Sequence, residues 1–181
     1  MNLKQLHIGF YGAVMGLAGL GLTARAAASL FPGVVRAPAY FTELWVALGC
    51  IALLLLIPAY ALKLARDPKT LKDDFTNPVQ LGFCGALPVG MTLVAGGIAP
   101  YSAAVADVLW WTGFALLLSF QGWALLRILS GGIELAQLNA GWLIVMVGGI
   151  VLPGSGLALG HDGASHLSFG VSPAGAGLVV A

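Results

Sequence analysis

Charged residues are scarce in this chain of 181 residues: they make up 8% of it, whereas a soluble domain carries roughly 25%. With so few charges the chain could not cover its own surface with polar groups in water, so a soluble globular domain is excluded. The net charge is only +1, and no basic cluster with interleaved aromatic residues occurs. Nucleic acid is therefore excluded as a partner.

Cysteine is equally scarce. Cys50 and Cys84 both lie in apolar runs, where cysteine behaves as a small hydrophobic residue, and no Cys-x-x-Cys spacing supports a metal site. A metal site formed by His161, Asp162 and His166 is a disfavoured alternative, because their segment is rich in glycine. Nucleophile–base pairs, phosphate loops and paired haem histidines are also missing. We therefore expect no enzyme activity, no cofactor and no metal.

Apolar residues dominate instead, at 59% of the chain, with a mean hydropathy of +0.95. A spanning helix needs ~20 mostly apolar residues, because the hydrocarbon layer is ~30 Å thick and a helix rises ~1.5 Å per residue. Long unbroken apolar runs also differ from the ~10-residue alternating strands of a membrane barrel. The sequence therefore predicts an all-α membrane protein with about five spans, at residues 8–30, 40–63, 79–99, 103–129 and 139–160.

The two ends of the chain need separate interpretation. Residues from about 167 onward are apolar but too few to span, so we interpret them as an incomplete sixth helix of a single transmembrane domain, residues 1–181. At the other end, Lys4, an apolar stretch and Ala24-Arg25-Ala26 also resemble a signal peptide. The later spans, and the arginine within the cleavage-like site, favour a first transmembrane helix.

Lysine and arginine predict the orientation, because they concentrate in cytoplasmic loops. With the N-terminus inside, two basic residues, Arg25 and Arg36, lie outside. The cytoplasmic ones are Lys4, Lys63, Arg66, Lys69, Lys72 and Arg127. We therefore predict a multi-pass protein of the plasma (inner) membrane with its N-terminus in the cytoplasm.

Glycine is concentrated in alternate spans, the first, third and fifth. Gly12, Gly16 and Gly19 share one face of the first span, while Pro88 and Pro153 interrupt the third and fifth. Bare glycine faces permit close helix packing, and they also leave room for a path beside the helix. From the residues alone, tight packing is the favoured interpretation and a pore is the alternative. The bulkier second and fourth spans suit contact with lipid.

Few charged side chains lie near the spans, and none lies at a span centre, which argues against a pump built on buried carboxylates. Asp107, about one turn inside the fourth span, is interpreted as a solvated interfacial acid rather than an ion site. Arg25, near the outer end of the first span, either snorkels to the headgroups or guides anions into a pore mouth. Glu43 suits the N-terminus of the second span.

Several short motifs follow one another in a specific order. They are Gly9-Phe10-Tyr11-Gly12, Ser29-Leu30-Phe31-Pro32, Asn77-Pro78-Val79, Ala86-Leu87-Pro88, Asp107-Val108-Leu109-Trp110 and Gly131-Gly132. In this order and spacing the chain resembles the tellurite-resistance/C4-dicarboxylate transporter family, whose superfamily includes the plant slow-type anion channels. The resemblance covers nearly the whole chain, but it matches only the first half of the family fold.

The resemblance implies a ten-helix channel in which odd-numbered helices surround a central pore and even-numbered helices form an outer ring. It also implies a homotrimer with one pore in each subunit, and it shifts the interpretation of the glycine faces towards a pore. Two features depart from the family. The aromatic gate on its ninth helix has no counterpart here, and its early proline in helix five falls where Ile144 and Val145 stand.

The leading functional hypothesis is anion transport by a slow-type channel or exporter, with chloride, nitrate, C4-dicarboxylate or tellurite-type anions as candidate substrates. Gly12, Gly16, Gly19, Pro88 and Pro153 are the predicted pore-shaping residues. The rival hypothesis is a helical membrane scaffold or assembly protein that transports nothing. We also expect a half-length chain to need further helices, from another polypeptide or another copy, to close a pore.

Overall fold

The computed structural model describes residues 7–31, 38–69, 77–130 and 140–171, which are helical and include no strand. Four apolar helical stretches are long enough to cross a membrane, and a shorter apolar stretch covers Gly82–Ile98. The predicted all-α membrane protein is thereby confirmed. In chain order the helices are η2 (Ile8–Phe10), α1 (Tyr11–Leu30), α2 (Ala39–Arg66), α4 (Pro78–Cys84), α5 (Ala86–Ile98), α6 (Ala103–Leu129), α7 (Ala140–Ala158) and α8 (Asp162–Val171).

The third apolar span is divided into α4 and α5 at Gly85. Pro88 has no backbone N–H for the carbonyl of Cys84, and its ring clashes with that carbonyl in a continuous helix. Once the chain has turned, Pro88 lies in the first turn of α5, where proline is tolerated. The proline therefore produces a break in the helix one turn earlier along the chain.

The last described helix, α8, begins at Asp162, earlier than the predicted start near 167. Gly160 ends the preceding segment with a left-handed φ of 78°, and His161 N–H donates to the Gly156 carbonyl at 2.8 Å. Asp162 then lies in the first turn, where a negative charge stabilises a helix. The sequence around His161 and Asp162 is therefore a helix start, which corrects the interpretation as a glycine-rich loop.

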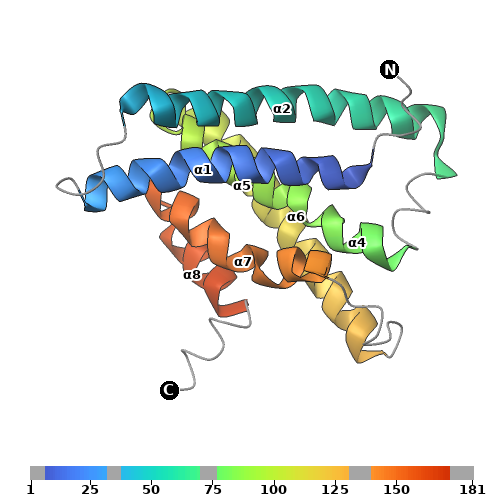
Figure 1. Ribbon diagram of the computed structural model, residues 1–181. Helices are drawn as coiled ribbons and strands as arrows, with labels where there is room; N and C mark the ends of the chain where they lie inside the picture. The colour runs from blue at the N-terminus through green and yellow to red at the C-terminus, as the bar shows by residue number, and fades with distance from the viewer. Residues whose placement is uncertain (1–6, 32–37, 70–76, 131–139, 172–181) are drawn as a thin grey trace.

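Helix α5 is the central helix of the bundle (Figure 1), with α1, α6 and α7 packed against it. Its residues from Val89 to Gly97 are almost all buried. Helix α2 lies antiparallel beside α1 and exposes many apolar side chains, among them Leu54, which is 71% exposed. An exposed apolar face of this kind suits contact with lipid, so a central α5 and a peripheral α2 agree with the predicted inner and outer helices.

The close helix contacts are made by glycines other than the predicted trio. A Cβ on Gly49 would lie 3.0 Å from the Ala18 Cβ, and one on Gly21 would lie 2.8 Å from a methyl carbon of Val46. By contrast, a Cβ on Gly12 or Gly16 would meet nothing within 4 Å. The expectation of a crowded surface at Gly16 is therefore wrong for the described part of the chain: that face of α1 is open.

Candidate functional site

A cavity of about 720 Å³ lies between α1, α5, α6 and α7, at the end of the bundle that the charge pattern predicts to be outside. Small residues form most of its wall, since these helices turn glycine, alanine and serine towards it. Those from the end of α5 and from α7 include Gly96, Ala99, Gly154, Ser155 and Ala158. Short side chains leave the space empty, and the hydroxyl groups of Thr23, Ser29 and Ser155 add a few polar points.

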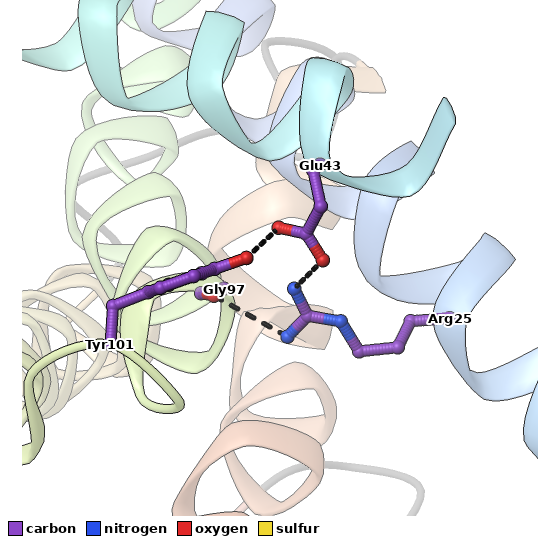
Figure 2. A network of polar contacts seen from close by, with 4 residues as sticks. All are labelled: Arg25, Glu43, Gly97 and Tyr101. Atoms are coloured by element: carbon purple, nitrogen blue, oxygen red, sulfur yellow. Dashed lines mark hydrogen bonds and ion pairs between the residues drawn. The ribbon is translucent and has the colours of Figure 1, made fainter. Parts of the chain in front are cut away.

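Arg25 is the cation in the described wall of this cavity, and its guanidinium is held from two sides. Nη2 lies 3.0 Å from Oε1 of Glu43 on α2, and Nη1 donates to the backbone carbonyl of Gly97 on α5 at 3.3 Å. Figure 2 shows this network with the Tyr101 hydroxyl, which donates to the other carboxylate oxygen of Glu43. Three parts of the bundle therefore meet at one arginine.

The position of each group follows from the ends of the helices. Arg25 lies in the last turns of α1, and Glu43 lies near the start of α2, so antiparallel packing brings the two side chains together. Tyr101 lies in the short turn between α5 and α6. The hydrogen bond to the Glu43 carboxylate raises the pKa of Tyr101, because ionising the phenol would remove the donor and place two negative charges side by side.

Asp107 is the acid in the described wall, and it faces His161 rather than solvent alone. His161 Nε2 lies 3.0 Å from Asp107 Oδ1, and the imidazole ring lies 4.8 Å from the ring of Trp110. The buried Trp110 also donates from Nε1 to Ser155 Oγ at 3.1 Å. Asp107 is thus partly the interfacial acid that was predicted, with 45% of its side chain exposed, but it also links α6 to the start of α8.

The described residues contain no group of three histidine, cysteine or acidic side chains placed to hold a metal ion. His161 is directed to Asp107, on another helix, rather than towards a ligand cluster with its sequence neighbours. The geometry of these residues thus differs from that of the metal site weighed from the sequence.

The predicted site residues divide into two groups. Arg25 lines the cavity, whereas the five predicted pore-shaping residues lie elsewhere on α1, α5 and α7. Gly12 and Gly16 face open space, and a Cβ on Gly19 would lie 3.8 Å from Leu93, which lines the cavity. The role of all five residues in shaping a path remains a prediction. The five predicted pore-shaping residues are Gly12, Gly16, Gly19, Pro88 and Pro153.

Two partners in the site were not predicted from the sequence. Glu43 was interpreted as a helix-start residue, although its place at the same predicted outer end as Arg25 is a signal for an ion pair. Tyr101 lies between the third and fourth predicted spans, and no residue spacing connects it to Glu43, which lies 58 positions earlier.

A family model described as SLAC1, voltage-dependent anion channel, matches residues 5–181, which is nearly the whole chain. A search of curated proteins finds no match. The family match confirms the resemblance drawn from the glycine and proline motifs, since that resemblance already included the slow-type anion channels.

Proposed function

This chain belongs to the SLAC1 voltage-dependent anion channel family, a family of transporters rather than enzymes, and on that basis we propose that it conducts small anions passively through the membrane. Chloride and nitrate are the proposed substrates. We further propose that the protein lies in the plasma (inner) membrane with its N-terminus in the cytoplasm, and that it assembles as a homotrimer, as the family resemblance implies.

The cavity beside Arg25 is the observation that carries this proposal. Its described wall is lined by short side chains and one cation, which attracts an anion without enclosing it in a set of tight ligands. Conduction requires binding that is favourable enough to admit an ion and weak enough to release it. A small-residue wall with a single part-exposed guanidinium meets both conditions.

The path proposed beyond the cavity follows the open face of α1. A Cβ on Gly19 would reach Leu93 at the cavity wall, and Gly16 and Gly12 continue along the same face towards the other end of the helix. The open space beside these glycines supports a path there better than the crowded helix packing that was first favoured. Pro88 and Pro153 would shape α5 and α7 around it.

Two other functions compete with passive conduction. A coupled exporter of C4-dicarboxylates or tellurite-type anions would need a site that holds its substrate and a coupling ion, and the described cavity wall offers only Arg25 and Asp107 as charged groups. A scaffold that transports nothing would need no cavity. The single cavity cation and its small-residue wall favour conduction over both.

Vesicle flux tests the proposal, with the protein purified from membranes as an intact assembly. Vesicles loaded with chloride or nitrate should release the anion when a potassium gradient and valinomycin supply the driving force. A scaffold releases nothing beyond the leak of empty vesicles, and a coupled exporter releases anion only when its coupling ion is present.

A matched pair of variants locates the path. Gly154 lines the cavity, and a Cβ there meets nothing within 4 Å, so Gly154→Phe should fold while filling the space. Gly122 is equally open but lies on the exposed side of α6, so Gly122→Phe is its control. Flux should be lost in the first and kept in the second. Equal flux from both would show that anions do not cross this cavity.

A further inference from the structure

The guanidinium of Arg25 already binds an anion, which is the carboxylate of Glu43. The contact joins Nη2 to Oε1 at 3.0 Å, and both side chains remain reachable by solvent, with 31% of Arg25 and 40% of Glu43 exposed. Arginine presents its N–H groups in a planar fork that matches carboxylates and other planar oxyanions. Arg25 lines the cavity while Glu43 does not, so Glu43 competes with an oxyanion from the cavity for the same guanidinium.

The guanidinium is also fixed in place independently of Glu43. Its other terminal nitrogen donates to the Gly97 carbonyl at 3.3 Å, which anchors it to the end of the central helix α5. The contacts to Gly97 and to Glu43 are separate (Figure 2), so Arg25 keeps this anchor if Glu43 moves away. The guanidinium of Arg25 therefore keeps its position when Glu43 is displaced.

Tyr101 provides a separate support for the Glu43 carboxylate. Its hydroxyl donates to Oε2, the oxygen that does not contact Arg25. A carboxylate displaced from Nη2 therefore keeps one hydrogen bond, and the cost of displacing it is smaller than the cost of leaving it unpaired. Oε1 of Glu43 makes the contact with Arg25 that an oxyanion would replace, and Oε2 makes the hydrogen bond with Tyr101 that would remain.

We propose that Arg25 is the anion-binding residue of this cavity and that Glu43 is its tethered competitor, which singly charged planar oxyanions such as nitrate displace. This inference rests on the proposed conduction and adds to it the residue that binds the anion and the residue that competes with it. Competition by Glu43 keeps anion binding weak, so a bound anion leaves the cavity readily. Asp107 and His161, the other charged or titratable pair at the described part of the cavity, are carried by α6 and by the residue before α8, and they contact each other.

Nitrate binding tests the inference without any transport. The melting temperature of the purified protein is recorded while nitrate replaces fluoride at constant ionic strength, because an ion that binds only the folded state stabilises it by RT ln(1 + c/Kd), where c is the nitrate concentration. In Glu43→Gln, the Kd for nitrate fitted to this dependence should fall about two- to fivefold, the range expected when a part-exposed ion pair no longer competes. In Arg25→Gln, the nitrate-dependent shift should disappear.

Matched controls carry the same charge changes far from the cavity. Asp67→Asn and Arg66→Gln alter exposed residues at the opposite end of α2, and both should bind nitrate as the unaltered protein does. Tyr101→Phe removes only the hydrogen bond to Glu43 Oε2 and leaves every charge in place. It therefore tests the inference if Glu43→Gln fails to fold. The displaced carboxylate then loses its support, and nitrate binding should weaken.

The outcomes separate this inference from the proposed function. If nitrate binds equally in the unaltered protein, Glu43→Gln and Arg25→Gln, the inference is overturned, even where vesicle flux is normal. If nitrate binding strengthens in Glu43→Gln and vanishes in Arg25→Gln while vesicles show no flux, the anion site stands and conduction fails. Weaker nitrate binding in Glu43→Gln would also overturn the competitor role.

Discussion

At the scale of single residues, the two charges in the described cavity wall are each matched by a partner from another helix. Arg25 pairs with Glu43, and Asp107 lies against His161, at 3.0 Å in both cases. Isolated charges near a membrane core are costly, and an ionic or hydrogen-bonding partner lowers that cost. The cavity can therefore carry these charged groups at a lower cost.

The contrast between open and crowded glycines predicts opposite results for two leucine substitutions. Gly49→Leu forces a side chain into the backbone of Ala18, where overpacking should cost about 1–3 kcal/mol of stability. Gly16→Leu meets open space, so folding should be retained while the proposed path is narrowed and flux falls. Thermal unfolding and vesicle flux measure the two effects. Leu54→Phe, on the exposed face of α2, is the control and should change neither.

Should Gly16→Leu unfold the protein as readily as Gly49→Leu does, the open face of α1 must be covered in the assembled protein by a closely packed neighbour rather than by a path.

The raised pKa of Tyr101 predicts where its link to Glu43 is lost. A group whose pKa is raised by folding contributes its interaction below the ordinary value, about 10 for tyrosine, and loses it as the pH rises through the raised value. The link should thus persist at pH 10 and break above it. Tyrosinate absorbance, compared between the unaltered protein and Glu43→Gln, measures this, with Tyr101→Phe identifying the signal. Identical titration curves would show that Glu43 does not hold the phenol.

At the scale of helices, the sequence predicts what depends on local composition. Four spans were predictable because their apolar runs exceed the thickness of the bilayer, and Pro58 did not interrupt the second one. The division between α4 and α5 at Gly85 was not predicted as such, because a membrane proline allows either a kink or a break. The neighbouring helices decide between these outcomes, and here α7 packs against both halves.

The site could be predicted only in part for the same reason. Arg25 stood out because a charge near a span is rare, and its chemistry alone indicated an anion. Its partners depend on which helix ends meet, and Tyr101 approaches Glu43 only once α5 lies between α1 and α6. Contacts between residues distant in sequence are set by packing, which a single sequence without an aligned relative does not reveal.

The predicted orientation of the helices can be tested by cysteine labelling. In a variant that lacks Cys50 and Cys84, a cysteine at Lys69 should resist an impermeant thiol reagent applied to intact cells, because this position follows α2 on the predicted cytoplasmic side. A cysteine at Arg36, outside the described residues, should react. Labelling of position 69 and protection of position 36 would reverse the assignment of the cavity to the outer face.

At the scale of the whole molecule, the bundle has a closed side and an open one. Helix α5 is enclosed by α1, α6 and α7, while the face of α1 that carries Gly12 and Gly16 has no neighbour among the described residues. A path bounded by protein needs a wall on every side, because unpaired backbone groups facing hydrocarbon cost several kcal/mol each.

We therefore expect the open side to be closed by helices other than the described ones, and another copy of this chain is one source of them. Residues 1–181 reconstituted alone at high dilution in planar bilayers should carry no current, and conductance should appear when the closing helices are supplied. Robust anion-selective single-channel currents from the purified chain, with no other polypeptide present, would refute dependence on a separate partner, and cross-linking would then show whether copies pair.

The link between Arg25 and Glu43 also bears on how the protein enters the membrane during synthesis. The ribosome delivers α1 first, so Arg25 reaches the bilayer before its carboxylate exists. Arginine at the centre of an inserting helix costs about 2.5–3.5 kcal/mol, and less towards the end, where Arg25 lies. We expect insertion of α1 to remain reversible until α2 emerges and supplies Glu43. In a translocon assay, α1 alone should insert less completely than the α1–α2 hairpin, and Arg25→Ala should remove the difference. The ion pair then makes the first two helices a single unit of membrane insertion.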